Sequence, residues 1–329
     1  MTRQQAETIL ARFYGLRVLV IGDLMADRHV WGNAGRVSPE APVLVVDVER
    51  ETFVPGGAAN VAHQLQALGA SVVVAGVVGA DENGERLKQE LAAFGCDVRA
   101  VVTAPDRPTT TKTRIVAGSQ QIVRVDREHR APLPDGVADA LLAQAREALG
   151  GCAAVLFSDY VKGALGRGTV AALVADARRA GVVTTANPKP TSARFYKDVD
   201  VAQFNRSEAD QAHGGLHRLD APPSEETFHA AGARLREGLE VRNLLVTRSA
   251  EGMTLFKEDG SHTDVQPHRV EVFDGTGAGD STIAGVTLAL AAGATPEEAA
   301  RIGNAAGGAV VRKVGVATAT REEIAALFQ

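Results

Sequence analysis

Short apolar runs alternate with segments of helical periodicity along most of the chain. The run from Arg17 to Gly22 is almost purely β-branched and apolar, which is typical of a strand buried on both faces. We expect strands at 17–22, 72–78, 153–157, 182–186 and 243–247, and helices over the first residues and at 82–94 and 167–180. Strands that alternate with helices indicate an α/β fold with a mostly parallel sheet that is covered by helices on both faces.

Two segments break this rhythm. Residues 33–55 and 107–126 alternate apolar with polar positions, which predicts antiparallel strands with one solvated face. We interpret them as a small β-sheet lid on a single domain of residues 1–329, although the length would also fit two domains. Exposed strand edges favour pairing with a second copy, so we expect a homodimer through the lid, unless a proline or a charge blunts the edge. Residues 211–226 are the best candidate for a long mobile loop.

The composition excludes several classes of protein. A net charge of −5 provides no general basic field, so we expect no nucleic-acid or membrane partner, and any phosphate site must be local. Cys96 and Cys152 lack CxxC spacing, which favours core thiols over a redox or metal site. No uncharged apolar stretch is long enough for a membrane span, and the first residues lack the apolar region of a signal peptide, so we expect a cytoplasmic protein.

The most informative segment is the glycine-rich turn Asp-Gly-Thr-Gly-Ala-Gly-Asp, residues 274–280, which leads into an apolar helical run at 282–292. Its glycines let the backbone turn sharply, and the following helix adds a positive N-terminal dipole. The N–H groups of Gly277, Ala278 and Gly279 would then hold negative charge, while Asp280 takes a proton from an alcohol. A simple tight turn with Asp280 as helix cap is the alternative.

Other phosphate-binding motifs do not fit this segment. A GxGxxG fingerprint fails, because Thr282 or Asp280 stands where the third glycine is needed. A P-loop also fails, because the chain contains no Gly-Lys dipeptide.

A second polar constellation is Pro-Gly-Gly-Ala-Ala-Asn-Val-Ala, residues 55–62, at the start of an apolar helix. Gly56 and Gly57 would let a ligand approach the backbone, and Asn60 offers a donor and an acceptor to a sugar hydroxyl. The glycines could equally be a hinge and Asn60 a helix cap. Asp23 and Asp27 follow the first strand and are natural acceptors for polyol hydroxyls, although loop acids are often only solvated.

PGGAANVA and DGTGAGDS, in this order and about 220 residues apart, resemble the paired signatures of ribokinase-like (phosphofructokinase B-type) carbohydrate kinases. GDLMADRHVWG, GRVSPEAPVLVV, TTTKTR, LFSDYVKGAL and LLVTRSAEGM are similar to the D-glycero-β-D-manno-heptose 7-phosphate kinases, the kinase half of a bifunctional kinase/adenylyltransferase. The resemblance covers essentially the whole chain. It implies a three-layer α/β/α fold and transfer of a phosphoryl group from ATP with Mg²⁺ to the C1 hydroxyl of the heptose, in the synthesis of ADP-heptose and lipopolysaccharide precursors.

The resemblance also implies roles for single residues. Asp280 would be the base and residues 277–279 the anion hole. Residues that it implies at the sugar are Asp23, Gly56, Gly57 and Asn60, and Asp27 is expected there from its place after the first strand. Residues expected at the nucleotide are Lys189, Asn205, Glu208, Thr247, Arg248, Gly252 and Asn304. Glu208 would lie near the magnesium ion, and Asp274 would help to hold a monovalent cation such as K⁺.

Three cations are candidates for the substrate phosphate. Lys112, Arg114 and Lys162 could supply local positive charge, or they could be ordinary surface cations. The chain departs from the family pattern in Asn187-Pro-Lys-Pro190, where relatives carry Asp-Pro-Lys-Gly, and in Gln203-Phe-Asn205, where they carry Thr-Pro-Asn. Asn187 removes a negative charge near the phosphates and puts a metal-organising role there in doubt.

Two further interpretations stay open. The acceptor could be another sugar or a nucleoside, such as fructose 6-phosphate or ribose, or the chain could be a non-catalytic sensor. None of the eight histidines lies in the HxGH motif of a nucleotidylyltransferase, so we expect that second activity on another polypeptide.

Overall fold

The computed structural model describes residues 1–118, 120–213 and 224–329. Within these residues the main sheet has nine strands in the order β13-β12-β11-β10-β9-β8-β1-β4-β5. The seven strands from β11 to β5 in this order are parallel. The strands are β1 (Arg17–Gly22), β4 (Ser71–Gly79), β5 (Val101–Ala104), β8 (Ala154–Ser158), β9 (Val183–Asn187), β10 (Val201–Asn205), β11 (Asn243–Thr247), β12 (Met253–Phe256) and β13 (His262–Val265). Strands β12 and β13 run antiparallel at one edge.

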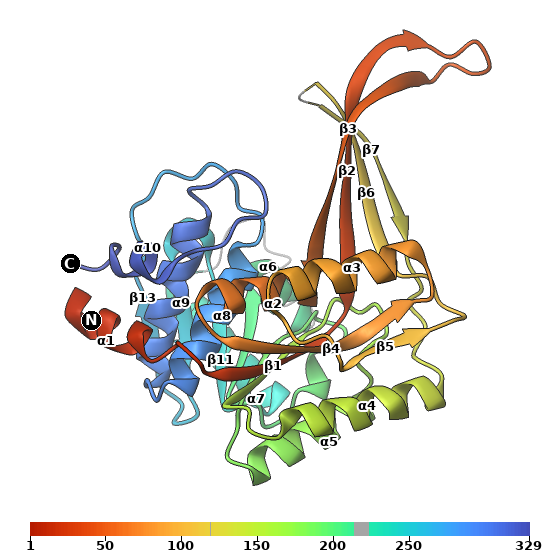
Figure 1. The fold of residues 1–329 in the computed structure, drawn as a ribbon. Coiled ribbons are helices and arrows are strands. Elements are labelled where there is room, and N and C mark those ends of the chain that lie inside the picture. The colour runs from red at the N-terminus through yellow and green to blue at the C-terminus, as the bar shows by residue number, and fades with distance from the viewer. Residues whose placement is uncertain (119, 214–223) are drawn as a thin grey trace.

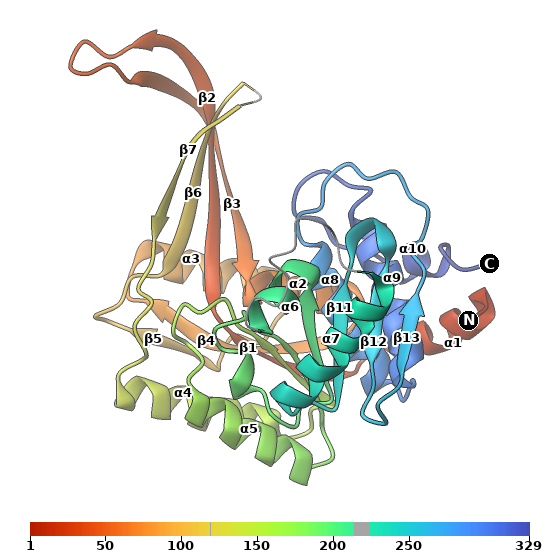
Figure 2. The same cartoon turned by 180° about the vertical axis from the view of Figure 1, so that it is seen from behind.

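Helices cover both faces of this sheet (Figures 1 and 2). One face carries α1 (Arg3–Ala11), α2 (Ala58–Ala67), α3 (Glu82–Ala93), α8 (Ala278–Ala291), α9 (Pro296–Val310) and α10 (Arg321–Ala325). The other carries α4 (Asp135–Leu149), α5 (Arg167–Arg179), α6 (Arg206–Ala212) and α7 (Glu225–Leu239). In β1, Val18 and Val20 join the first core while Leu19 and Ile21 join the second, which explains why this strand is apolar from Val18 to Ile21.

A second, four-stranded sheet projects from the body of the molecule (Figure 1). Its order is β3-β2-β6-β7, from β2 (Leu24–Val37), β3 (Leu44–Gly57), β6 (Thr110–Ala117) and β7 (Gln120–Arg127). Strand β2 pairs antiparallel with β3 and parallel with β6. The structure therefore confirms the α/β fold with a smaller separate sheet. The predicted range 33–55 was too short, because pairing with β3 and β6 extends β2 back to Leu24, directly after β1.

Other expected elements lie within a few residues of their predicted bounds. The helix predicted at 82–94 is α3, and the helical run at 282–292 is α8, which starts earlier, at Ala278. Residues 214–223 of the predicted mobile loop lie outside the described residues, and α6 and α7 flank them. None of the described helices has the length and apolar character needed to cross a membrane.

Candidate active site

The glycine-rich segment forms the N-terminus of α8, as the sequence predicts. Gly277 is the residue before the helix and has φ +80°, a left-handed conformation that favours glycine. Asp280 lies in the first turn with 8% of its surface exposed, and the helix it starts is buried over most of its length. A carboxylate is thereby held at the positive end of a core helix.

Each carboxylate oxygen of Asp280 accepts a hydrogen bond. Asn60 Nδ2 donates to Oδ2 at 2.6 Å, and the Tyr160 hydroxyl donates to Oδ1 at 2.9 Å. Burial raises the pKa of Asp280, and the bonds from Asn60 and Tyr160 and the nearby Lys189 oppose that rise. The result is a buried carboxylate with a fixed orientation, a suitable general base. Asn60 contacts the candidate base itself, a partner that the sequence did not indicate.

A small cavity of about 160 Å³ opens beside Asp280 at the carboxyl ends of β9, β10 and β11. Its lining comprises Tyr160, Asn187, Lys189, Gln203, Asn205, Glu208, Thr247, Gly277, Gly279 and Asp280. The carboxyl ends of parallel strands are where α/β sheets bind ligands. This cavity brings the predicted base together with four residues expected on the nucleotide side.

A larger cavity of about 900 Å³ adjoins it, and the two share Thr247 and Gly279. Its lining includes apolar Met253, Val270, Val272 and Val311 beside Gly252 and Asn304. This volume is in the range of sites for small organic ligands. Gly252 has φ +81°, and a Cβ atom at this position would lie 2.1 Å from the Val265 carbonyl oxygen, so only glycine fits there.

Glu208 and Lys189 form an ion pair in the small cavity. Glu208 also completes a capping box at the start of α6: it accepts from the Asn205 N–H at 3.0 Å, while Asn205 Oδ1 accepts from the Glu208 N–H at 2.8 Å. Lys189 Nζ lies 4.9 Å from the centre of the Tyr160 ring. A cation, a carboxylate and Tyr160, one of the two donors to Asp280, thus line one small space.

The two aspartates expected at the sugar, Asp23 and Asp27, have different partners. Asp23 is 2% exposed, and its carboxylate accepts from the backbone N–H groups of Tyr160, Lys162 and Ala164 at 2.8–3.0 Å. Asp23 therefore holds the loop that carries Tyr160. Asp27 pairs with Arg114, and its carboxylate lies so close to Gly56 that a side chain at 56 would displace it.

The three cations that are candidates for the substrate phosphate differ in whether a carboxylate already pairs with them. Arg114 is paired with Asp27, and Lys162 forms a largely buried ion pair with Glu128. Lys112 Nζ lies 5.9 Å from the centre of the Tyr160 ring, and burial lowers its pKa against the opposing effect of Asp27. Lys112 forms no ion pair within the part of the chain that the structure describes.

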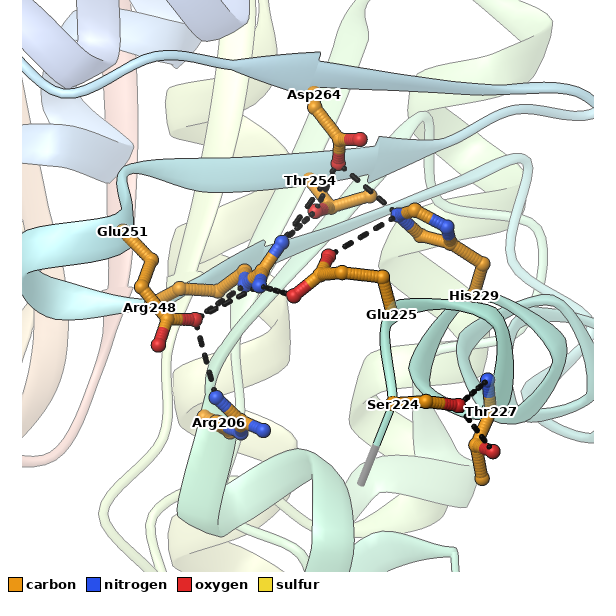
Figure 3. Close-up of polar contacts among 9 residues, drawn as sticks. All are labelled: Arg206, Ser224, Glu225, Thr227, His229, Arg248, Glu251, Thr254 and Asp264. Atoms are coloured by element: carbon orange, nitrogen blue, oxygen red, sulfur yellow. Dashed lines mark hydrogen bonds and ion pairs between the residues drawn. The ribbon is translucent and has the colours of Figure 1, made fainter. Parts of the chain in front are cut away.

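Among the residues expected at the nucleotide and the cations, Arg248 and Asp274 line neither cavity. Arg248 is 8% exposed, and its guanidinium pairs with Glu225 and Glu251 (Figure 3). It also lies over the Phe228 ring, so the side chain is held against α7, and its expected contact with the nucleotide stays a prediction. The carboxylate of Asp274 accepts from the backbone N–H groups of Thr276 and Gly315, each at 2.9 Å, and so ties two loops together.

Sequence reasoning missed Tyr160, and it missed the contact of Gln203, whose Nε2 donates to the Gly279 carbonyl oxygen at 2.9 Å. Tyr160 stands in SDYVKGAL, directly after a buried strand, and this position was the one signal that could have indicated it.

Comparison with known proteins agrees with this geometry. The profile described as pfkB family carbohydrate kinase matches residues 16–323. Two curated relatives, each called bifunctional protein HldE, from Geobacter metallireducens and Geobacter sulfurreducens, are 42% identical to the chain over 98% of its residues. The chain spans 65% of the length of each.

Solved structures share the fold at lower identity. An Arabidopsis thaliana ribokinase complexed with ribose and ATP is 20% identical, with a TM-score of 0.74 over 95% of this chain and 98% of that one. The Escherichia coli phosphofructokinase-2 in complex with fructose-6-phosphate is 20% identical, with a TM-score of 0.73 over the same shares.

Proposed function

Because the chain belongs to the pfkB family of carbohydrate kinases, it is a phosphotransferase with an alcohol group as acceptor, and we propose that this alcohol is the C1 hydroxyl of D-glycero-β-D-manno-heptose 7-phosphate. The family predicted from the two glycine-rich motifs is confirmed. The choice of heptose is supported by the five further motifs that resemble the heptose kinases and by the 42% identity to the bifunctional relatives. The product would be a 1,7-bisphosphate, made in the cytoplasm on the route to ADP-heptose and lipopolysaccharide.

The single observation that carries the catalytic proposal is the placement of Asp280. Its carboxylate is buried at the N-terminus of α8, with both oxygens oriented by donors. We propose that Asp280 takes the proton of the attacking hydroxyl while the N–H groups of Gly277, Ala278 and Gly279 face the charge on the transferring phosphoryl group. Catalysis would then consist mainly of positioning and electrostatic stabilisation, as phosphoryl transfer requires.

The family implies ATP and a divalent cation, and the residues present fit both. The 900 Å³ cavity with Gly252 and Asn304 would bind the nucleoside. The phosphates would extend past Thr247 and Gly279, which line both cavities, toward Asp280. Mg²⁺ usually binds proteins through one or two carboxylates plus phosphates and water. Glu208, with the amide oxygens of Asn187 and Asn205 nearby, offers such a set. The cation would neutralise charge on the phosphates.

For the sugar phosphate we propose Lys112 as the principal cation. Arg114 and Lys162 already have carboxylate partners, so they would orient neighbouring groups rather than neutralise a phosphate. Asp27, Gly56 and Gly57 would lie at the sugar hydroxyls. A monovalent cation at Asp274 would act by fixing the loop before α8.

A panel of acceptors tests the function. ADP release would be measured with Mg·ATP and, in turn, heptose 7-phosphate, fructose 6-phosphate and ribose, with D280N as the catalytic control. We expect turnover with the heptose and at least about a hundredfold lower kcat in D280N with ATP still bound, the low end for loss of a general base. Turnover of fructose 6-phosphate with none of the heptose would refute the substrate. Wild-type turnover in D280N would refute the base, and no turnover of any sugar would favour a sensor.

A further inference from the structure

A second cluster of ionisable groups lies at the antiparallel edge of the main sheet, beside α7. His262 and Asp264 stand two residues apart on β13, so their side chains leave the same face of the strand. His229 reaches them from α7. Among the described residues, these three form the one group of at least three His, Cys, Asp or Glu side chains whose ligand atoms all lie within 4.8 Å of one another.

We propose that His229, His262 and Asp264 form a binding site for a divalent transition-metal ion, with Zn²⁺ as the ion that fits best. Imidazole and carboxylate groups are the usual zinc ligands besides thiolate. A set of two imidazoles and one carboxylate favours Zn²⁺ and its neighbours over Mg²⁺, which prefers an octahedral set of oxygens. Nothing in the phosphoryl transfer proposed above uses these residues.

The three side chains already converge without a metal ion. The rings of His229 and His262 are stacked with centroids 3.9 Å apart, and His229 Nε2 lies 3.2 Å from Asp264 Oδ1. Figure 3 shows His229 and Asp264 pointing toward each other from the helix and the sheet. A bound ion would replace this contact with two coordinate bonds, and the stacked imidazole rings would turn so that each directs a nitrogen at the ion.

Surrounding contacts restrict the ligands in the way that metal sites require. Thr254 is fully buried on β12 and donates its hydroxyl proton to Asp264 Oδ1 at 2.6 Å. Hydrogen bonds from such neighbours orient ligating carboxylates and tune their affinity. The His229 ring is flanked by Phe228 and Phe256, at centroid distances of 5.7 and 6.4 Å. Glu225 Oε2, 3.8 Å from His229 Nε2, could enter as a fourth ligand.

The charge balance of the cluster suits a cation. Arg248 lies 3.8 Å from Asp264, which would oppose metal binding if the guanidinium were unpaired. It is paired with Glu225 and Glu251, and Glu251 also pairs with Arg206 (Figure 3). Three carboxylates therefore face two guanidinium groups, and a net negative charge remains beside the two imidazoles. Because the imidazoles must be unprotonated to coordinate, acidification should weaken binding.

Calorimetric titration of the untagged chain with ZnCl₂, in the absence of nucleotide, tests the site. We expect one Zn²⁺ per chain, a rise in Tm, and no competition from an equal concentration of MgCl₂. H262Q alters an exposed residue and should lower the affinity at least about tenfold. T254V keeps the shape of a buried side chain and should lower it by about tenfold through Asp264. The matched control is H129Q, which removes an exposed histidine outside the cluster and should bind Zn²⁺ as the wild type does.

The outcomes separate clearly. Loss of binding in H262Q with retention in H129Q supports the site. Absence of stoichiometric binding, or equal binding in wild type and H262Q, overturns it. Circular dichroism of each variant verifies the fold, and none of these results bears on the identity of the sugar.

Discussion

At the scale of single residues, the two donors on Asp280 decide how readily this carboxylate accepts a proton. Burial alone would raise its pKa, which strengthens the base but also leaves it protonated at low pH. The hydroxyl of Tyr160 and the amide of Asn60 favour the ionised form and limit that rise. Tyr160 therefore positions the carboxylate of the proposed base and lowers its pKa.

We expect Y160F to shift the pH dependence of the kinase. Removing the hydroxyl removes a hydrogen bond to the ionised carboxylate, so the pKa of Asp280 rises further and the base is protonated over a wider acidic range. The acidic limb of the kcat/KM profile should move to higher pH by about one unit, and kcat above that limb should fall about tenfold. The measurement is ADP release as a function of pH.

Y196F provides the matched control. Tyr196 is fully buried and donates to Asp159 Oδ2 at 2.7 Å, so it makes the same kind of bond to a different carboxylate. Its loss should lower the free energy of unfolding by about 1–3 kcal/mol and leave the acidic limb in place. A Y160F profile identical to that of the wild type would contradict the tuning role.

The sequence predicted some of these residues and could not predict others. Asp280 and Asn60 stand in glycine-rich motifs, and glycines reveal where a backbone turns. Tyr160 stands in no such motif, and its partner lies 120 residues later, so only the folded chain brings them together. Arg248 follows a residue that does line the cavity, but a sequence does not show which way a side chain points, and carboxylates from α7 and the following turn hold it elsewhere.

At the scale of elements, the junction of β3 and α2 depends on the conformation of Gly57. Its φ is +58° and its ψ is −131°, a backbone conformation that is strained for every residue except glycine. A Cβ there would lie 2.5 Å from the carbonyl oxygen of Asp23, which accepts the first N–H of α2. Gly57 thus sets the direction of the helix that presents Asn60.

We expect G57A to destabilise this junction. The substitution should lower the free energy of unfolding by more than about 1 kcal/mol, because both the dihedral angles and the close carbonyl oppose it. Gly35, in the same small sheet, has open space around its missing side chain, so G35A should stay within about 0.5 kcal/mol of the wild type. Urea unfolding compares the two, and equal stabilities would show that the junction is not strained.

The loop between β8 and α5 depends on a second device, the buried carboxylate of Asp23. Burial, followed by the charge of Asp159, raises the pKa of Asp23 to about 6, against the effect of three backbone N–H donors. The folded chain therefore binds a proton more tightly than the unfolded chain does. Stability from this group is fully present below pH 3.8 and is lost as the pH rises through about 6.

Ionisation of Asp23 should therefore destabilise the folded chain. As the pH rises from 4 to 6, it should lower the free energy of unfolding by on the order of 2–3 kcal/mol. D23N cannot ionise and should remove that component of the slope, although it loses one accepted hydrogen bond at every pH. Urea unfolding at several pH values gives both slopes, and parallel curves for the two proteins would contradict the assignment.

The elements themselves were predictable where burial leaves a pattern. Strand β1 is apolar from Val18 to Ile21 because its alternate side chains enter two different cores, and its predicted bounds were correct. The start of β2 was not predictable in this way. Leu24 to Ala26 are buried like a continuation of β1, and only pairing with β3 and β6 shows that the chain has entered another sheet.

At the scale of the whole molecule, the projecting sheet has two different faces. The pairing register places Asp27, Lys112 and Asp126 side by side, so one face is charged. Because side chains alternate, the opposite face carries Val30, Ile115 and Val123, which are also in register, next to the ion pair of Arg28 and Glu51. The charged face belongs with the residues proposed at the sugar, and on the opposite face Val123 and Val125 make the outer strand β7 apolar.

We propose that this apolar edge, Val123 and Val125 of β7, packs against the same edge of a second copy. Val123 and Val125 are 45% and 53% exposed on β7, and they are neighbours on one face of this edge strand. Exposed apolar side chains at the edge of a sheet favour association.

Light scattering after size exclusion should give the mass of a dimer for the wild type. V125E would place a charge in the apolar interface and should shift the population to monomer, with a higher KM if the partner steadies the sheet over the sugar. V314E changes a valine that is 84% exposed elsewhere and should remain dimeric. A monomeric wild type, or a fully dimeric V125E, would exclude this interface.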